Sequence, residues 1–268
     1  MKEIVFTAEA IASLICGGLA MILSAAAAVF FWHKKGGLKL KPLIVGAVVF
    51  PLFALILKAI PLYPLMIADN AVSRAINGST LLTCAAAGLS AGIFEETGRF
   101  IAYKTLLRDC TDRRDAVSYG LGHGGFECLY IAVSAMIAMA FMGLVINSQG
   151  IEAVAKGAEG EMLDRVLTQL GAYSKETFGI AALAVCERIS ALVLQISMSV
   201  VVFAAARDKR KIWLYPLAVL LHSCIDFSLV PYASGKVGMI GMELMIAAYS
   251  AVTAVCVYFL LYRKMKGA

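Results

Sequence analysis

Long apolar stretches alternate with short polar ones along this chain. Seven stretches are long enough to cross a bilayer, whose hydrocarbon core of about 30 Å takes about 20 helical residues. They lie near residues 8–32, 42–62, 80–103, 116–146, 177–206, 212–232 and 238–262. The second stretch is the least regular, because Pro51 and Lys58 interrupt it. This pattern predicts an all-α, polytopic transmembrane helical bundle of about seven spans.

One further segment, residues 147–176, is too polar to be a span. It places acidic residues such as Glu152 among apolar residues such as Met162 and Leu170. Such a mixture is typical of an amphipathic helix that lies on a surface. We therefore expect a single integral membrane domain over residues 1–268, with 147–176 as an extracytoplasmic amphipathic excursion.

The composition supports a membrane protein. Of the residues, 61% are hydrophobic and 16% are charged, whereas soluble domains usually have about 25% charged residues and less than about half apolar ones. The net charge of +6 lies in short basic clusters between apolar runs, which argues against nucleic-acid binding. The seven cysteines show no C-x-x-C spacing, so we interpret them as small apolar side chains. We expect a multi-pass protein of the plasma membrane.

Basic residues mark one side of the predicted bundle. Fifteen of them follow the first, third, fifth and seventh spans: Lys34, Lys35, Lys39, Lys41, Lys104, Arg108, Arg113, Arg114, Arg207, Lys209, Arg210, Lys211, Arg263, Lys264 and Lys266. The other side has six: Lys2, Arg74, Lys156, Arg165, Lys175 and Lys236. Because cytoplasmic loops of membrane proteins carry the excess of Lys and Arg, we expect the N-terminus outside and the C-terminus in the cytoplasm.

Three predicted spans carry motifs of several ionisable residues, which are costly in hydrocarbon and therefore indicate function. The third span has E-E-T-G-R at 95–99, the fourth has G-H-G-G-F-E at 122–127, and the sixth has H-S-C-I-D at 222–226. Residues four apart share a helix face. This spacing pairs Glu95 with Arg99, His123 with Glu127, and His222 with Asp226.

The depths of these residues agree. With a rise of about 1.5 Å per residue from the cytoplasmic basic clusters, Glu95 and His123 each lie about 13 Å deep. His222 lies about 16 Å deep, and Asp226 about 22 Å. We therefore expect one polar site, somewhat cytoplasmic of the midplane. The glycines of the motifs are expected either to let helix backbones approach or to leave room for a substrate.

The fifth span contributes polar residues too. Glu187 and Arg188 come out at about 30 Å from the cytoplasmic side, so we expect a structural pair near the outer surface. Gln195 is interpreted as a polar contact between helices. For Glu127 the spacing favours neither a structural nor a functional role.

At these motifs the chain resembles the CAAX-protease and bacteriocin-processing superfamily of intramembrane peptidases, and in particular its bacterial YhfC branch of intramembrane metalloproteases. The resemblance covers about half of the chain. It implies that Glu95 or Glu96 activates water, that His123 assists, and that His222 with Asp226 steadies the oxyanion. Arg99 is either a structural counter-ion or part of the catalytic group.

Three features depart from the superfamily pattern. Its usual spacing is E-E-x-x-x-R, one residue longer than here, so the choice between Glu95 and Glu96 as base stays open. Its last motif more often ends in Asn, where this chain has Asp226, and Gln195 stands near where this branch would have a histidine.

Two histidines and a carboxylate form a known catalytic Zn²⁺ ligand set. His123, His222 and Glu95 are therefore candidate ligands, with binding of a metal left open.

The favoured function is hydrolysis of a peptide bond by glutamate-activated water near the cytoplasmic leaflet. The expected substrate is a membrane-embedded or membrane-associated peptide, and no organic cofactor is expected. One alternative is a proton- or cation-coupled transporter that uses the same polar cluster, although no inverted repeat supports it. Another is a catalytically silent binding or immunity protein, a role also known in the superfamily.

Overall fold

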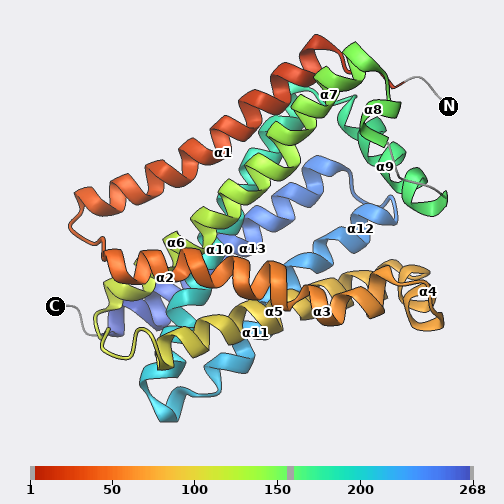
Figure 1. Cartoon of the computed structure of the whole chain (residues 1–268). Helices are drawn as coiled ribbons and strands as arrows, with labels where there is room; N and C mark the ends of the chain where they lie inside the picture. Colours follow the sequence, from red (N-terminus) through yellow and green to blue (C-terminus); the bar gives the residue numbers. More distant parts are fainter. Residues whose placement is uncertain (1–3, 156–159, 266–268) are drawn as a thin grey trace. The chain divides into compact units, whose positions relative to one another are not determined.

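Helices form wherever the apolar pattern predicted a span. The computed structural model describes residues 4–155 and 160–265; it is 85% helical, and this part of the chain contains no β-strand. The α-helices are α1 (Ala8–Lys34), α2 (Leu40–Phe50), α3 (Ala59–Leu62), α4 (Ala71–Asn77), α5 (Thr80–Lys104), α6 (Arg113–Ile131), α7 (Ala138–Gln149), α8 (Glu152–Ala155), α9 (Gly160–Tyr173), α10 (Phe178–Arg207), α11 (Leu214–Cys224), α12 (Leu229–Ala233) and α13 (Met239–Leu260) (Figure 1). π-helical turns at Pro51–Leu57, Tyr63–Ile67 and Ala132–Ile137 join some of them, and 3₁₀ turns lie at Lys209–Lys211, Ile225–Ser228 and Tyr262–Lys264. The all-α prediction is confirmed.

The number of spans depends on one bent pair of helices. Within the described part of the chain, six helical runs are long and apolar enough to cross a membrane: Ala8–Lys34, Leu40–Ile67, Arg113–Gln149, Phe178–Arg207, Lys209–Ala233 and Met239–Lys264. α4 and α5 pass the same test only together, and they are bent by 106° where they meet. The chain is a multi-pass membrane protein, and its seven predicted spans match the upper count. The orientation of the termini stays a prediction.

The helices pack as two compact units. Unit 1 takes residues 1–24 and 128–188, and unit 2 takes residues 25–127 and 189–268. In unit 1, the backbone N–H of Phe6 donates to Asn147 Oδ1 at 2.9 Å, and Asn147 Nδ2 donates back to the Phe6 carbonyl at 2.7 Å. This double hydrogen bond holds the start of the chain beside the end of α7.

The predicted surface excursion falls in unit 1. α8 and α9 form there, while residues 156–159 of the predicted segment lie outside the described residues. On α9, Leu170 and Val166 pack among the apolar residues of unit 1, whereas Asp164 and Arg165 are exposed. The helix is thus amphipathic, as the pattern indicated. Its extracytoplasmic position and the single-domain expectation stay predictions.

In unit 2, aromatic side chains join the long helices. The Tyr103 ring on α5 lies 4.9 Å from that of Tyr119 on α6 and 5.2 Å from that of Phe203 on α10, measured between centroids. α11 lies beside α5 (Figure 1). Arg207 donates to the backbone carbonyls of Tyr103, Leu107 and Cys110, the first two at 2.9 and 2.5 Å. Because the last carbonyls of a helix lack partners within it, this guanidinium stabilises the end of α5.

Glycines bring α2 against α6. A Cβ atom at Gly122 would lie 1.9 Å from the Leu43 carbonyl oxygen, and one at Gly46 would lie 2.3 Å from the Tyr119 carbonyl oxygen. A Cβ at Gly125 would meet nothing within 4 Å. Of the two roles considered for the glycines, Gly122 therefore permits a close backbone approach, whereas Gly125 borders open space.

This difference predicts the effects of two matched substitutions. Gly122→Ala must push α2 away from α6, so we expect it to lower the free energy of unfolding by about 1–3 kcal/mol, as overpacking does. Gly125→Ala meets no atom and is expected to change it by no more than about 1 kcal/mol. Both values would come from reversible unfolding in mixed micelles. Equal destabilisation by the two variants would contradict the close approach.

Candidate functional site

The two adjacent acids of α5 face different neighbours. Successive residues of an α-helix point about 100° apart, so Glu95 and Glu96 diverge although they are consecutive. Glu95 is directed toward α6 and α10, and Glu96 toward α11. Both are buried, with relative exposures of 5% and 0%. Their environments therefore decide which acid has access to a substrate.

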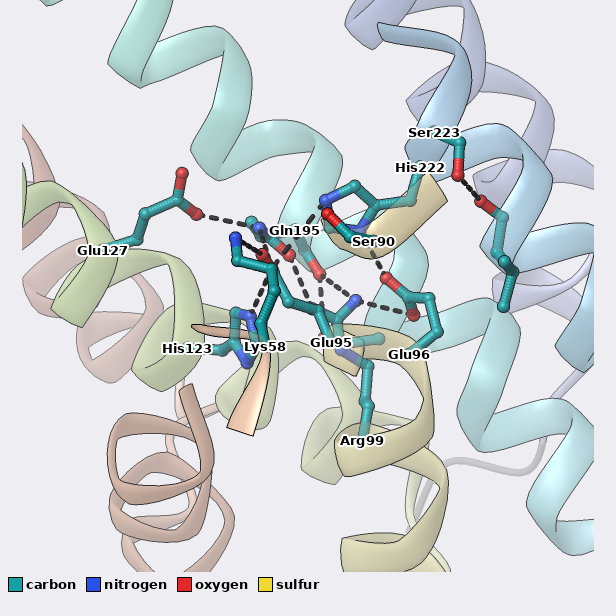
Figure 2. A network of polar contacts seen from close by, with 12 residues as sticks. Lys58, Ser90, Glu95, Glu96, Arg99, His123, Glu127, Gln195, His222 and Ser223 are labelled. Atoms are coloured by element: carbon teal, nitrogen blue, oxygen red, sulfur yellow. Dashed lines mark hydrogen bonds and ion pairs between the residues drawn. The ribbon is translucent and has the colours of Figure 1, made fainter. Parts of the chain in front are cut away.

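One oxygen of Glu95 is held by three side chains. Its Oε2 lies 3.1 Å from His123 Nε2 and accepts a hydrogen bond from Gln195 Nε2, also at 3.1 Å. His222 Nε2 lies 3.7 Å from the same oxygen. The other oxygen, Oε1, lies 4.0 Å from Lys58 Nζ. Figure 2 shows these side chains directed toward one another from α5, α6, α10, α11 and the segment before α3.

Glu96 is more completely enclosed. Its Oε1 lies 2.6 Å from His222 Nδ1, and its Oε2 lies 3.2 Å from Arg99 Nη1. The side chains of Glu96 and Arg99 are both fully buried. The predicted pairing of Glu95 with Arg99 is thus wrong, and Arg99 pairs with the acid three residues before it. Gln195 Oε1 also accepts from Arg99 Nη2 at 2.5 Å, so the guanidinium lies between Glu96 and Gln195.

Gln195 is the centre of the network. Besides Glu95, its Nε2 donates to Glu127 Oε2 at 2.8 Å, and its backbone carbonyl accepts from Arg99 Nη1 at 3.4 Å. Its polar character inside an apolar helix indicated an interhelical contact, which is confirmed. The sequence did not indicate that this contact reaches both the candidate base and Arg99.

Lys58 is a residue that sequence reasoning missed as part of the site. Its charge inside a predicted span was treated only as an interruption, although a buried charge in a span is itself a functional signal. It lies at the turn between the π-helical segment Pro51–Leu57 and α3, and its side chain keeps 23% of its surface exposed. Glu95, in comparison, keeps 7%.

The sixth span places its two motif residues apart. α11 ends at Cys224, and Asp226 lies in the tighter 3₁₀ turn that follows. His222 directs its ring nitrogens to Glu96 and Glu95, and among the described residues no hydrogen bond joins it to Asp226. Asp226 instead lies against Gly88 of α5, where a Cβ would come within 3.1 Å of Oδ2.

Glu187 and Arg188 pair with each other within unit 1, as the structural interpretation of this pair predicts, and their position near the outer surface stays a prediction. The candidate site lies in unit 2. Glu95, His123 and His222, which were predicted to converge, do so within 3.1 and 3.7 Å, and the predicted oxyanion residue Asp226 belongs to the same unit.

Each of the two adjacent acids has a cation near it. The carboxylate of Glu96 has the guanidinium of Arg99, and that of Glu95 has the ammonium of Lys58. A charge buried without a partner would cost several kcal/mol. Because an ionised carboxylate only accepts hydrogen bonds, the proton of a neutral His123 is on Nε2, facing Glu95. The buried Nδ1 of His123 has no hydrogen-bond partner in the part of the chain that the structure describes.

The donor atoms around Glu95 have the type and spacing that a Zn²⁺ ion needs. Two ligands of a tetrahedral Zn²⁺ ion, each bonded at about 2.0–2.2 Å, stand roughly 3.3–3.6 Å apart. The distances from Glu95 Oε2 to His123 Nε2 and His222 Nε2 bracket this value. The donor types fit Zn²⁺, whereas no set of three or more potential ligands within residues 4–155 and 160–265 is already drawn together as a metal centre.

Comparison with known proteins identifies a family that covers the region of the site. A family described as YhfC intramembrane metalloprotease matches residues 19–249 of the chain, which include every site residue named above. The chain is also 26% identical over 251 residues to "Uncharacterized membrane protein YhfC" of Bacillus subtilis (strain 168). The alignment covers 91% of this chain and 94% of the relative. No solved structure gives a significant match.

Proposed function

This chain belongs to the YhfC intramembrane metalloprotease family, and we propose that it hydrolyses peptide bonds within the membrane, with Glu95 as the base that activates water. The observation that carries this choice is the asymmetry of the Glu95 carboxylate. His123 and Gln195 hold Oε2, while Oε1 makes no hydrogen bond among the described residues. Glu96 is fully buried, and Arg99 and His222 lie against its two oxygens.

In the proposed reaction, Glu95 Oε1 removes a proton from water while the water oxygen bonds to the scissile carbonyl carbon. The carbonyl π electrons move onto its oxygen. When this intermediate collapses, the C–N bond breaks and the nitrogen receives the proton from Glu95. His123 and Gln195 keep the carboxylate oriented throughout, which places the base within reach of the water.

His222 keeps the role that the superfamily resemblance implies, which is to help steady the oxygen of the intermediate, whereas Asp226 shares it only when its carboxyl group carries a proton. When bound, Zn²⁺ would be held by His123, His222 and Glu95, and it would supply a Lewis acid that polarises the water. The substrate is a membrane-embedded or membrane-associated peptide, because the site lies on helices of the predicted spans.

The test uses the full chain in proteoliposomes and a synthetic library of apolar peptides about 20 residues long, the length of one span, with four central positions randomised. Mass spectrometry of the products detects cleavage at any of these sequences. We expect the wild-type protein to cleave a subset of the library and His123→Ala to lower the rate by about 10²-fold or more. His33→Ala is the matched control, because His33 is exposed and outside the network.

The outcomes separate the candidate functions. Cleavage by the wild type and His33→Ala but not by His123→Ala supports a peptidase. If the wild type cleaves none of the library, or if His123→Ala cleaves as fast as the wild type, the proposal is wrong. Proton or cation flux without cleavage in the same proteoliposomes would assign the cluster to transport.

A further inference from the structure

Lys58 lies in the least regular part of its span. π-helical turns precede and follow it, at Pro51–Leu57 and Tyr63–Ile67, and Pro61 and Pro64 lack backbone donors. π-helical turns in otherwise α-helical segments are frequent at functional sites, because they redirect side chains. The backbone here therefore deviates from a plain span at the residue that carries the charge.

The packing of this segment fixes where Lys58 points. Phe53 of the π-helical turn lies on Gly98 of α5 so closely that a Cβ there would come within 2.5 Å of the ring. Together with the approach of α2 to α6 at Gly122, this contact holds the segment against the helices that carry Glu95 and His123. These contacts hold the preceding part of the span beside α5 and α6, and Lys58, which follows it, lies with Nζ 4.0 Å from Glu95 Oε1.

The distance between Lys58 and Glu95 is informative. Charge-assisted hydrogen bonds between ammonium and carboxylate groups usually measure about 2.7–2.9 Å, whereas Lys58 Nζ and Glu95 Oε1 are 4.0 Å apart. A lysine that only neutralised Glu95 would be expected to close this gap. The gap instead lies on the side of Glu95 that has no other hydrogen bond, where the proposed reaction places the water.

Accessibility separates Lys58 from the other cation of the network. Arg99 is fully buried and is committed to Glu96 and Gln195. Lys58 is 23% exposed, so a peptide that approaches from the membrane can reach it. His222 is the other candidate for binding the oxyanion. Its ring nitrogens already face carboxylates, with Nδ1 2.6 Å from Glu96 Oε1 and Nε2 3.7 Å from Glu95 Oε2.

We propose that Lys58 is a catalytic residue that binds the carbonyl oxygen of the scissile bond and stabilises its developing negative charge. This assignment rests on the proposed peptidase function. The water then lies between Glu95 Oε1 and the carbonyl carbon, and the oxygen that gains the electron pair lies against the ammonium. A positive group that meets charge formed only in the transition state acts on kcat rather than on substrate binding.

The test compares Lys58→Met and Lys58→Arg with wild type in proteoliposomes, on a peptide of the randomised library that the wild type cleaves. We expect Lys58→Met to lower kcat by about 10²–10³-fold, the usual effect of losing one oxyanion donor, with KM within about threefold. Lys58→Arg keeps the charge, so its kcat is expected to lie between those of Lys58→Met and the wild type. Lys104→Met is the control, because Lys104 Nζ donates to the Ala206 carbonyl at 2.6 Å, outside the network.

A second readout reports contact with the carbonyl oxygen itself. The same peptide with a thioamide at the scissile bond presents sulfur in place of that oxygen. The slowing caused by sulfur should be large in the wild type and reduced at least about threefold in Lys58→Met, because the two changes remove the same interaction. If Lys58→Met does not fold, Lys58→Gln, which also removes the charge, takes its place, and a slowing by sulfur equal to that of the wild type contradicts the assignment.

These outcomes distinguish the two proposals. If Glu95→Gln abolishes cleavage while Lys58→Met retains kcat within about threefold, only the assignment of Lys58 is overturned. The same holds if sulfur slows Lys58→Met as much as it slows the wild type. A rise in KM with unchanged kcat likewise overturns it. If the wild-type protein cleaves no library peptide, the proposed function fails and the assignment fails with it.

Discussion

Replacing Glu95 by glutamine is expected to lower kcat for peptide cleavage by about 10²–10⁴-fold, the range for loss of a general base. Glutamine keeps the shape of the side chain, but it cannot accept the proton of the water. KM should change little, because the substrate is held by other groups. The measurement is steady-state cleavage in proteoliposomes of a library peptide that the wild type accepts.

The neighbouring acid provides the matched control. Glu96→Gln leaves the Glu95 carboxylate and its contacts to His123 and Gln195 in place, so we expect the folded protein to lose less than about tenfold in kcat. Its main effect should be on stability, since Arg99 then lacks its carboxylate partner. If Glu96→Gln abolished cleavage and Glu95→Gln did not, Glu96 would be the base.

Arg99→Met is expected to lower the free energy of unfolding by about 3–5 kcal/mol, the usual cost of removing one partner of a buried ion pair. The reason is that Glu96 and Arg99 are both fully buried, and the substitution leaves a carboxylate without its cation. Reversible unfolding in mixed micelles measures the difference. Arg99→Lys keeps the charge and should lower the free energy of unfolding by less than Arg99→Met does.

A double variant tests the cause of this loss. In Arg99→Met/Glu96→Gln both charges are gone, so the double variant should be more stable than Arg99→Met alone. Additive losses from the two single substitutions would show that the pair does not account for the cost. Arg99 would then stabilise the fold through Gln195 instead.

The convergence of the three motifs was predictable because basic clusters give each helix a common point from which to count residues. A constant rise per residue then places Glu95, His123 and His222 at nearly one level, and the structure brings these side chains together. The rotation of each helix about its axis was not predictable from depth. For this reason the pairing of Arg99 with Glu96 rather than with Glu95 required the packing of α10, which carries Gln195.

The roles of Lys58 and Gln195 were hidden for different reasons. Lys58 reaches the site because π-helical turns change the direction of the backbone, and periodicity reasoning assumes regular helices. Gln195 joins Glu95 on α5, Glu127 on α6 and Arg99 through contacts between helices distant in sequence. Both residues carry a signal in the sequence, which is polarity inside an apolar span, but that signal does not name their partners.

The bent start of the third span has a local cause. The Asn70 side chain accepts from the backbone N–H groups of Val72 and Ser73 and begins α4, and Ser79 caps α5 by accepting from Leu82 N. Two separate helix starts within ten residues leave a break between α4 and α5. α5 therefore begins where the apolar pattern placed it, while α4 was not foreseen as a separate helix.

The most direct test of water activation by Glu95 is a single turnover of the wild-type protein on a cleavable library peptide in H₂¹⁸O, with the new carboxyl terminus analysed by mass spectrometry. If Glu95 acts as a base, the oxygen added in the first turnover comes from the solvent, so this carboxyl group carries one ¹⁸O atom. Products without ¹⁸O in the first turnover would mean that a side-chain oxygen attacks the peptide bond. That result, or the absence of any cleavage, would contradict glutamate-activated hydrolysis at this site.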